Sequence, residues 1–150
     1  MKRELVKDWM SREVVVVKYD NSLPEAHQIM ISNKIRRLPV TDENGRLVGI
    51  ITLGDVRSAS PSPATSISIF EMNYLLSSLA VERIMTPNPV TIDPNLSIDE
   101  AANIMLQKRI SGLPVVDDEG YICGIITESD IFRMVVLHEW NNDLIDTIVK

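Results

Sequence analysis

The chain has 150 residues, of which 45% are hydrophobic and 24% are charged, and its formal net charge is −6 at pH 7. This length suits one compact body or two small halves that share a core. The negative charge argues against a protein that binds nucleic acids without regard to sequence, because such proteins carry a basic field.

The sequence contains no segment that predicts export or membrane insertion. Residues 1–8 lack the apolar run of a signal peptide, and the longest purely apolar runs, such as Val14–Val17, are far too short to cross a bilayer. We therefore expect a cytoplasmic protein that does not enter a membrane. The single cysteine, Cys123, lies in an apolar run, where a buried and inert thiol is expected.

The first elements expected along the chain are a strand and a helix. Val14–Val17 is β-branched throughout, which predicts a buried strand. Ser22 then precedes a helical pattern, and Glu25 three residues later completes the signature of a capping box. The apolar face of this predicted helix holds Leu23, Ala26, His27, Met30 and Ile31.

A β-hairpin and a second helix follow. Leu38–Val40 is predicted to be a strand, and its proline favours an edge or the start of a strand. Asn44-Gly45 predicts a two-residue turn that leads into a returning strand over Arg46–Thr52. The next helix is expected to start near Asp55. The predicted order of elements is therefore β-α-β-β-α, with a right-handed crossover between the first two strands.

The second half of the chain repeats the first at an offset of about 75 residues, so that Thr127 falls on Thr52. About 19 of 51 aligned pairs are identical, without a gap. The capping box recurs at Ser97 and Glu100, and the last helix is expected to start near Asp130. The chain is thus a tandem repeat of one structural unit.

The segments outside the two copies are predicted from their composition and from the spacing of their apolar residues. Residues 58–65 are rich in serine and proline, which indicates a linker. The spacing of apolar residues over Ile69–Leu76 predicts a helix that packs against the rest of the fold. Beyond the last helix, Trp140 and the set within Leu144–Val149 predict a short amphipathic extension.

The sequence gives little support for an enzyme. The histidines His27 and His138 are isolated, and no serine or cysteine stands in the setting of a catalytic nucleophile. For His27, a core or rim position is the simpler interpretation. No spacing of a metal site occurs, and glycine-rich phosphate loops are absent. We expect neither catalysis nor a metal held by the protein.

The strongest candidate for a site is the duplicated Gly-Ile-Ile-Thr-x-x-Asp. Thr52 and Asp55, like Thr127 and Asp130, stand where a strand ends and a helix begins. One interpretation is structural, because Thr-x-x-Asp nearly matches a capping box. The other is functional, because a carboxylate suits a ribose diol, and a threonine hydroxyl with nearby amides suits a phosphate.

These features resemble a pair of cystathionine-β-synthase (CBS) domains, the tandem arrangement called a Bateman module. The resemblance rests on Met85-Thr86-Pro87, both Leu-Pro-Val strands, both Asp-x-x-Gly turns and both Gly-Ile-Ile-Thr-x-x-Asp junctions. It implies a mixed α/β (α+β) fold of two β-α-β-β-α repeats packed as a pseudo-two-fold pair. The expected ranges are a first domain over 1–57, a linker with a helix over 58–79, and a second domain with a helical extension over 80–150. The linker further resembles the acetoin-utilisation type of CBS protein, without its ACT domain.

The resemblance implies a regulatory ligand, namely AMP, ADP, ATP or S-adenosylmethionine, bound in the cleft between the two repeats. Asp55 and Asp130 would then take the ribose hydroxyls, and Thr52 and Thr127 the ribose or phosphate. Residues that precede each Leu-Pro-Val strand would reach the phosphate or flank the base. These residues are Ile35, Arg36 and Arg37 in the first copy and Ile110 and Ser111 in the second.

The two copies differ at the positions expected to meet phosphate. Arg36 and Arg37 offer two guanidinium groups, which form charge-assisted hydrogen bonds to phosphate oxygens, whereas Ser111 offers only a hydroxyl. A simpler alternative is that both arginines pair with surface acids such as Asp42 or Glu43. Arg133 is a weaker phosphate candidate, for which a solvated face is the simpler interpretation.

The function expected from these residues is a nucleotide-sensing regulatory module. The alternative is a structural or protein-interaction module that binds no ligand. The family resemblance also implies a homodimer and a regulated enzyme or transporter that the sequence does not identify. No nucleic acid and no membrane is expected as a partner.

Overall fold

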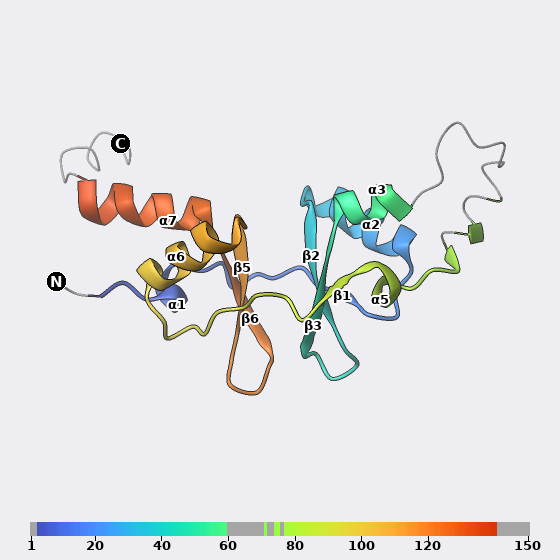
Figure 1. Cartoon of the computed structure of the whole chain (residues 1–150), viewed down its shortest axis with the longest axis horizontal. Helices are drawn as coiled ribbons and strands as arrows, with labels where there is room; N and C mark the ends of the chain where they lie inside the picture. The colour runs from blue at the N-terminus through green and yellow to red at the C-terminus, as the bar shows by residue number, and fades with distance from the viewer. Residues whose placement is uncertain (1–2, 60–70, 72–73, 76, 141–150) are drawn as a thin grey trace. The chain divides into compact units, whose positions relative to one another are not determined.

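The computed structural model describes residues 3–59, 71, 74–75 and 77–140 (Figure 1). The chain divides into two compact units. We call Val15–Pro89 the repeat-1 unit, and Met1–Val14 with Val90–Lys150 the repeat-2 unit. The expected helix over Ile69–Leu76 and the extension over Leu144–Val149 fall mostly or wholly outside the described residues.

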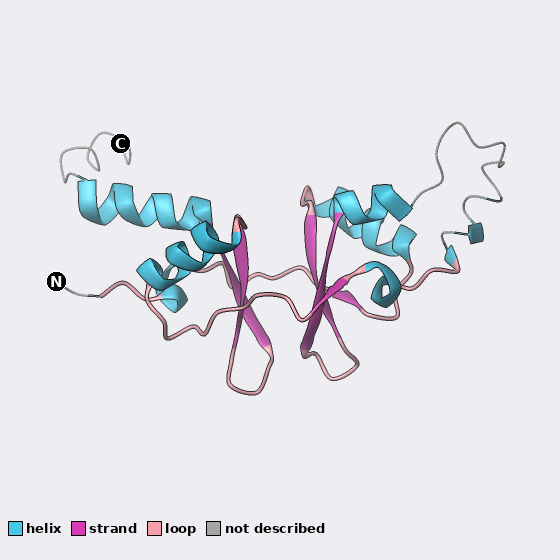
Figure 2. Ribbon diagram, in the orientation of Figure 1, coloured by secondary structure: helices cyan, strands magenta, loops and turns pink. Residues whose placement is uncertain are grey.

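The repeat-1 unit is built on a sheet with the strand order β1-β2-β3-β4, in which only β1 and β2 are parallel. Helices α2 and α3 pack against β2 and β3 respectively, and α5 packs against β3 (Figure 2). The strands are β1 (Val17–Lys18), β2 (Arg37–Thr41), β3 (Leu47–Thr52) and β4 (Thr86–Pro87). The helices are α2 (Leu23–Asn33), α3 (Leu53–Ala59) and α5 (Val81–Ile84).

The repeat-2 unit repeats this plan around the antiparallel pair of β5 and β6. An isolated parallel bridge between Ile92 and Val115 stands where β1 pairs with β2 in the other unit. The strands are β5 (Gly112–Val116) and β6 (Ile122–Thr127). The helices are α1 (Val6–Trp9), α6 (Ile98–Lys108) and α7 (Glu128–Met134), with the π-helix η1 over Val135–Trp140.

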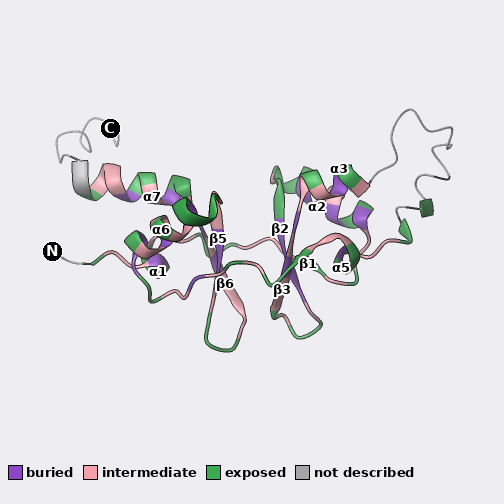
Figure 3. Cartoon of the chain, in the orientation of Figure 1, coloured by how far each residue is buried: buried purple, intermediate pink, exposed green. Residues whose placement is uncertain are grey.

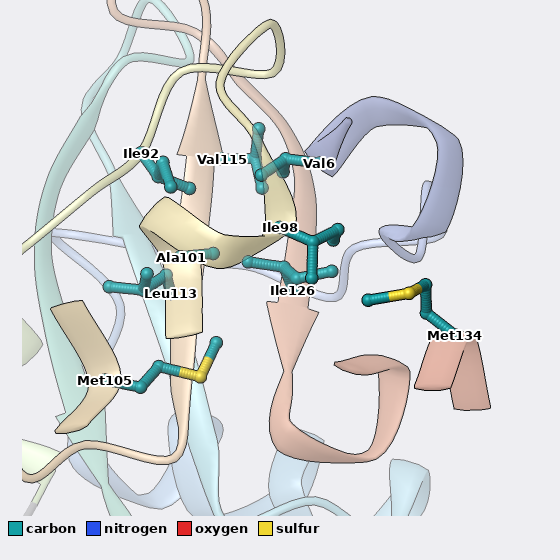
Figure 4. Close-up of a cluster of buried hydrophobic side chains, with 9 residues drawn as sticks. All are labelled: Val6, Ile92, Ile98, Ala101, Met105, Leu113, Val115, Ile126 and Met134. Atoms are coloured by element: carbon teal, nitrogen blue, oxygen red, sulfur yellow. The ribbon is translucent and has the colours of Figure 1, made fainter. Parts of the chain in front are cut away.

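Each unit buries its own apolar core, and the strands carry the most buried segments (Figure 3). Leu38 and Ile51 in the repeat-1 unit, and Leu113 and Ile126 in the repeat-2 unit, have no exposed surface. Burying such a side chain stabilises the fold by about 1.5–3 kcal/mol. In Figure 4 the side chains of the repeat-2 core converge from α1, α6, β5, β6 and α7.

Each unit also includes the short segment that precedes the other repeat in the sequence. Val6 is fully buried in the repeat-2 core, and Val81, its counterpart, is fully buried in the repeat-1 core. Ile50 of β3 pairs with Thr86, and Ile125 of β6 pairs with Ser11. The compact units therefore cut across the predicted ranges 1–57, 58–79 and 80–150, which remain a prediction about the duplicated sequence.

Both predicted capping boxes are confirmed. The hydroxyls of Ser22 and Ser97 accept hydrogen bonds from the amides of Glu25 and Glu100, whose carboxylates accept from the serine amides in return. Each helix ends on a residue in the left-handed region, where the sequence has no glycine. These residues are Lys34 and Arg109, both with φ 55°.

Three local predictions for the first copy are wrong. Pro39 marks neither an edge nor the start of a strand, since β2 begins at Arg37 and lies between β1 and β3. Of Val14–Val17, only Val17 lies in a strand, because β-branched residues form a strand only where a neighbour is available, and β2 offers partners to Val17 and Lys18 alone. The two-residue Asn-Gly turn requires positive φ at both residues, but only Gly45 has it. Instead Asp42 closes a longer turn, since its Oδ1 accepts from the amides of Asn44 and Arg46.

Candidate ligand-binding site

The repeat-1 unit gathers the predicted site residues at one end of its hairpin. The β2 residue Arg37 is the register partner of Thr52, the last residue of β3. The amide of Leu53, the first residue of α3, donates to the carbonyl oxygen of Arg36 at 2.8 Å. Ile35, Arg36 and Arg37 therefore lie beside the junction that carries Thr52 and Asp55. We call these five residues half-site 1.

The repeat-2 unit builds a matching corner. Gly112 of β5 is the register partner of Thr127, and the amide of Glu128 donates to the carbonyl oxygen of Ser111 at 3.0 Å. This arrangement places Ile110 and Ser111 beside Thr127 and Asp130, which together we call half-site 2. The same backbone geometry thus recurs in both units, because the strand-to-helix junction is duplicated in the sequence.

In half-site 1, the structural interpretation of Thr-x-x-Asp is confirmed. The amide of Thr52 donates to Oδ2 of Asp55 at 2.8 Å, and the amide of Asp55 donates to Oγ1 of Thr52 at 3.0 Å. This reciprocal pair satisfies two amides at the start of α3. No side chain of the described residues donates to Oδ1 of Asp55, and the residue is only half-buried. Capping therefore leaves one oxygen of this carboxylate open to a hydroxyl donor.

In half-site 2, Asp130 is more completely engaged. It is 8% exposed, and its Oδ2 accepts from the amide of Thr127 at 2.9 Å and from the hydroxyl of Thr127 at 3.1 Å. Its Oδ1 accepts from Nη2 of Arg133 at 3.0 Å. Both carboxylate oxygens thus have a donor within the chain.

The arginines of half-site 1 are exposed, and neither forms an ion pair with a described carboxylate. The alternative that Arg36 and Arg37 pair with Asp42 or Glu43 is therefore wrong. One oxygen of Asp42 serves its own turn instead. Two exposed guanidinium groups that form no ion pair with the described residues are suited to bind phosphate oxygens at this corner.

The apolar members of the two half-sites have one face on the protein interior. Ile35 is half-buried against the repeat-1 core, and Ile110 is half-buried against the repeat-2 core. Their remaining surface lies next to the residues that start β2 and β5. This placement is compatible with the predicted contact to a base.

A hollow of about 160 Å³ lies in the repeat-1 unit, outside half-site 1. The acidic side chains that line it disfavour a phosphate. Their negative field is evident at Tyr19, whose pKa is raised above its ordinary value mainly by the Glu43 carboxylate and next by that of Asp20. The hollow is therefore a poorer candidate for a nucleotide site than the half-sites are. It is lined by Tyr19, Asp42, Glu43, Val48, Glu82 and Met85.

The described residues also show the surroundings of the other sequence candidates. Within the described part of the chain, no group of three or more acidic, histidine or cysteine side chains is arranged to hold a metal ion. The thiol of Cys123 is half-buried and donates to the carbonyl oxygen of Val115 at 3.4 Å, and burial raises its pKa. Such a thiol is less reactive than an exposed one. No described helix is both long and apolar enough to cross a membrane.

The contact between Arg133 and Asp130 was missed by sequence reasoning, which favoured a solvated face for this arginine. Its side chain is 55% exposed, yet its Nη2 also donates to the carbonyl oxygen of Trp9 at 3.2 Å. The spacing of three residues on a helix was the available signal. The contact to Trp9 has no local signal, because it joins distant parts of the sequence.

The sequence matches the CBS domain family over residues 6–62 and 81–137. A CBS domain-containing protein of Dictyostelium discoideum is 37% identical over 132 residues, which cover 88% of this chain and 91% of that protein. Enzymes match over less of their length. L-aspartate semialdehyde sulfurtransferase of Methanocaldococcus jannaschii is 37% identical over 130 residues, but these cover only 23% of it.

Solved structures of CBS pairs share this fold. The CBS domain pair of protein MJ0100, in complex with 5′-methylthioadenosine and S-adenosyl-L-methionine, is 35% identical with a TM-score of 0.70, over 89% of this chain and 96% of that one. CBSX2 of Arabidopsis thaliana in complex with AMP is 27% identical with a TM-score of 0.76, over 91% and 99%. A putative acetoin utilization protein of Vibrio cholerae is 26% identical with a TM-score of 0.74, over 90% and 92%.

The family match covers most of the chain, and both matched ranges contain one of the strand-to-helix corners described above. This match confirms the expected mixed α/β fold, and the similar structure from Vibrio cholerae confirms the resemblance to acetoin-utilisation CBS proteins. This chain belongs to the CBS domain family, as a tandem pair of CBS domains.

Proposed function

We propose that the chain is a regulatory module that binds an adenosine-containing ligand, namely AMP, ADP, ATP or S-adenosylmethionine. The observation that carries this proposal is the corner of half-site 1. Within the described part of the chain, no side chain donates to one carboxylate oxygen of Asp55, and the two exposed arginines beside it have no acidic partner. The similar CBS pairs with adenosine-containing ligands support the same ligand class.

The chemistry of each group fits a part of such a ligand. A ribose offers two adjacent hydroxyl donors, and a carboxylate accepts both. Arg36 and Arg37 supply charge-assisted donors for phosphate oxygens. Ile35 supplies apolar surface for a base at half-site 1, and Ile110 does so at half-site 2. The position of the ligand in a cleft between the repeats comes from the family resemblance and stays a prediction.

A ligand of this kind regulates by stabilising the state to which it binds more tightly. The proposed output is therefore a change in a regulated enzyme or transporter, driven by the difference in ligand affinity between two states. Asp55 and Asp130 both remain in the duplicated motif. This retention favours a ligand-binding module over a purely structural one.

Thermal unfolding of ligand-free protein tests the proposal. A ligand that binds only the folded state raises the melting temperature. At a ligand concentration of a hundred times Kd, it raises the free energy of unfolding by about 2.7 kcal/mol. We expect AMP, ATP or S-adenosylmethionine to raise it, and ribose-free adenine to have little effect. If none of the adenosine ligands shifts melting at millimolar concentration, the proposal is wrong.

A homodimer is the second part of the proposal. Helices α6 and α7 expose large apolar side chains, with Leu106 79% exposed and Phe132 62% exposed. Exposed apolar surface of this kind favours association. Light scattering would show the mass of a dimer for the natural chain, and Leu106→Glu with Phe132→Glu would shift it toward a monomer. A natural chain that stays monomeric at high micromolar concentration contradicts this part.

A further inference from the structure

The two half-sites differ in how their acids are occupied. In half-site 1, the described residues leave Oδ1 of Asp55 without a side-chain donor. In half-site 2, Oδ1 of Asp130 receives a charged donor from Arg133 at 3.0 Å, and the acid is nearly buried. A ribose hydroxyl that binds to Oδ1 of Asp130 would have to compete with the guanidinium for this oxygen.

Arg133 is also held in place by other groups. The same Nη2 that reaches Asp130 donates to the carbonyl oxygen of Trp9 at 3.2 Å, and the guanidinium carbon lies 5.8 Å from the centre of the Trp9 ring. This second distance is within the range of a cation–π interaction. The arginine is therefore shared between half-site 2 and helix α1.

Trp9 is itself fixed on both sides. Its Nε1 donates to Oε2 of Glu4 at 2.8 Å, and the His138 ring meets it edge-on at 5.0 Å between centroids. Nδ1 of His138 lies 3.1 Å from Oε1 of Glu4. These contacts join the N-terminal segment and η1 around Trp9, which in turn contacts Arg133.

The first repeat has no equivalent of this arrangement. Ser58 stands at the position that corresponds to Arg133, and Ile84 at the position that corresponds to Trp9. A serine is too short and uncharged to neutralise Asp55. The difference between the half-sites therefore comes from residues outside the duplicated motif, at positions where the two copies differ in sequence.

We infer that Arg133 acts as an internal competitor that closes half-site 2, so that adenosine ligands fill the Asp55 half-site first. This inference rests on the proposed function. Ligand reaches Asp130 only when Arg133 leaves it, and the apparent affinity of half-site 2 falls by the fraction of molecules in which it has left. Release also removes the contact between Arg133 and the Trp9 carbonyl, so filling of half-site 2 alters the surroundings of Trp9.

Calorimetric titration with adenosine tests the inference, because a ligand without phosphate gives a displaced Arg133 no new partner. For the natural chain we expect one tighter site, lost in Asp55→Ala, and one weaker site. Arg133→Ala should tighten the weaker site by about two- to fivefold, the size expected for a half-exposed ion pair, and leave the tighter site unchanged. Arg57→Ala, which removes an exposed arginine of α3 outside half-site 1, should change neither site.

Trp9 emission provides a readout that would not respond to ligand if Arg133 only stabilised the fold. In a Trp140→Phe background, Trp9 is the remaining tryptophan. Its emission should change at adenosine concentrations that fill the weaker site, and stay constant while the tighter site fills. Arg133→Gln keeps a long side chain near Trp9 without the charge, and should tighten the weaker site even if Arg133→Ala fails to fold.

The outcomes separate the two proposals. If adenosine binds at the Asp55 half-site but neither Arg133 variant tightens the other site, the competitor role is wrong and the proposed function stands. If adenosine, AMP, ADP, ATP and S-adenosylmethionine bind neither to the natural chain nor to any variant, both are wrong.

Discussion

Gly124 of β6 lies directly against the segment around Ser11, so that a Cβ on this glycine would be 2.9 Å from the carbonyl oxygen of Ser11. The Met10 side chain covers the same glycine. Gly49 has the matching relation to Met85 and to the carbonyl oxygen of Thr86 at 3.0 Å. Each repeat thus uses a glycine to admit the segment that precedes the other repeat.

Gly124→Ala should destabilise the protein by about 1–3 kcal/mol, because the new methyl group meets backbone that cannot move aside cheaply. Urea unfolding measures the change. Gly54→Ala is the matched control, since a Cβ there would meet only Oγ1 of Thr52 at 3.6 Å, and alanine is the better helix former in α3. If the two variants are equally stable, the close approach at Gly124 has no energetic role.

Lys34→Gly should stabilise the protein by about 0.5–1 kcal/mol, because the helix α2 ends there with φ 55° and ψ 43°, a conformation that glycine adopts without strain. Arg109→Gly tests the matching end of α6, at φ 55° and ψ 45°. A rise in the melting temperature for both is the expected result. A fall for both would show that the lysine and arginine side chains outweigh the backbone preference.

Acid should weaken the first capping box. The amide of Ser22 at 3.0 Å, together with the side chain of Asn21 at 2.7 Å, holds the pKa of Glu25 below its ordinary value of 4.5. A lowered pKa means that the ionised form stabilises the fold above the unfolded pKa, and that this contribution disappears as pH falls through the folded pKa. The difference in stability between the natural chain and Glu25→Gln should therefore be largest near pH 7 and shrink below about pH 4.5. Unfolding curves at several pH values measure it, and a difference independent of pH contradicts the prediction.

Replacement of Arg36 and Arg37 by alanine should separate ligands by their phosphate content. Exposed charge-assisted hydrogen bonds contribute about 1–2 kcal/mol together, or about five- to thirtyfold in affinity. We expect that loss for AMP and little change for adenosine. Calorimetry compares the two ligands. Equal losses for both would mean that the arginines contact the nucleoside or hold the loop, and not the phosphate.

Much of this architecture could be predicted because the signals are local and duplicated. Ser22 with Glu25, and Thr52 with Asp55, lie three residues apart, and their hydrogen bonds follow from helix geometry alone. The exchange of segments could not be predicted, because the pairing of Ser11 with Ile125 depends on contacts between distant parts of the chain. The contact between Arg133 and Trp9 was missed for the same reason.

The most direct test of the account is calorimetric titration of ligand-free protein with AMP and with S-adenosylmethionine, for the natural chain, Asp55→Ala and Asp118→Ala. Asp118 is an exposed acid outside both half-sites and controls for the loss of charge. We expect that at least one ligand binds, that Asp55→Ala loses the tighter site at a stability cost of about 1 kcal/mol, and that Asp118→Ala binds normally. Equal binding by all three proteins, or binding by none, would contradict it.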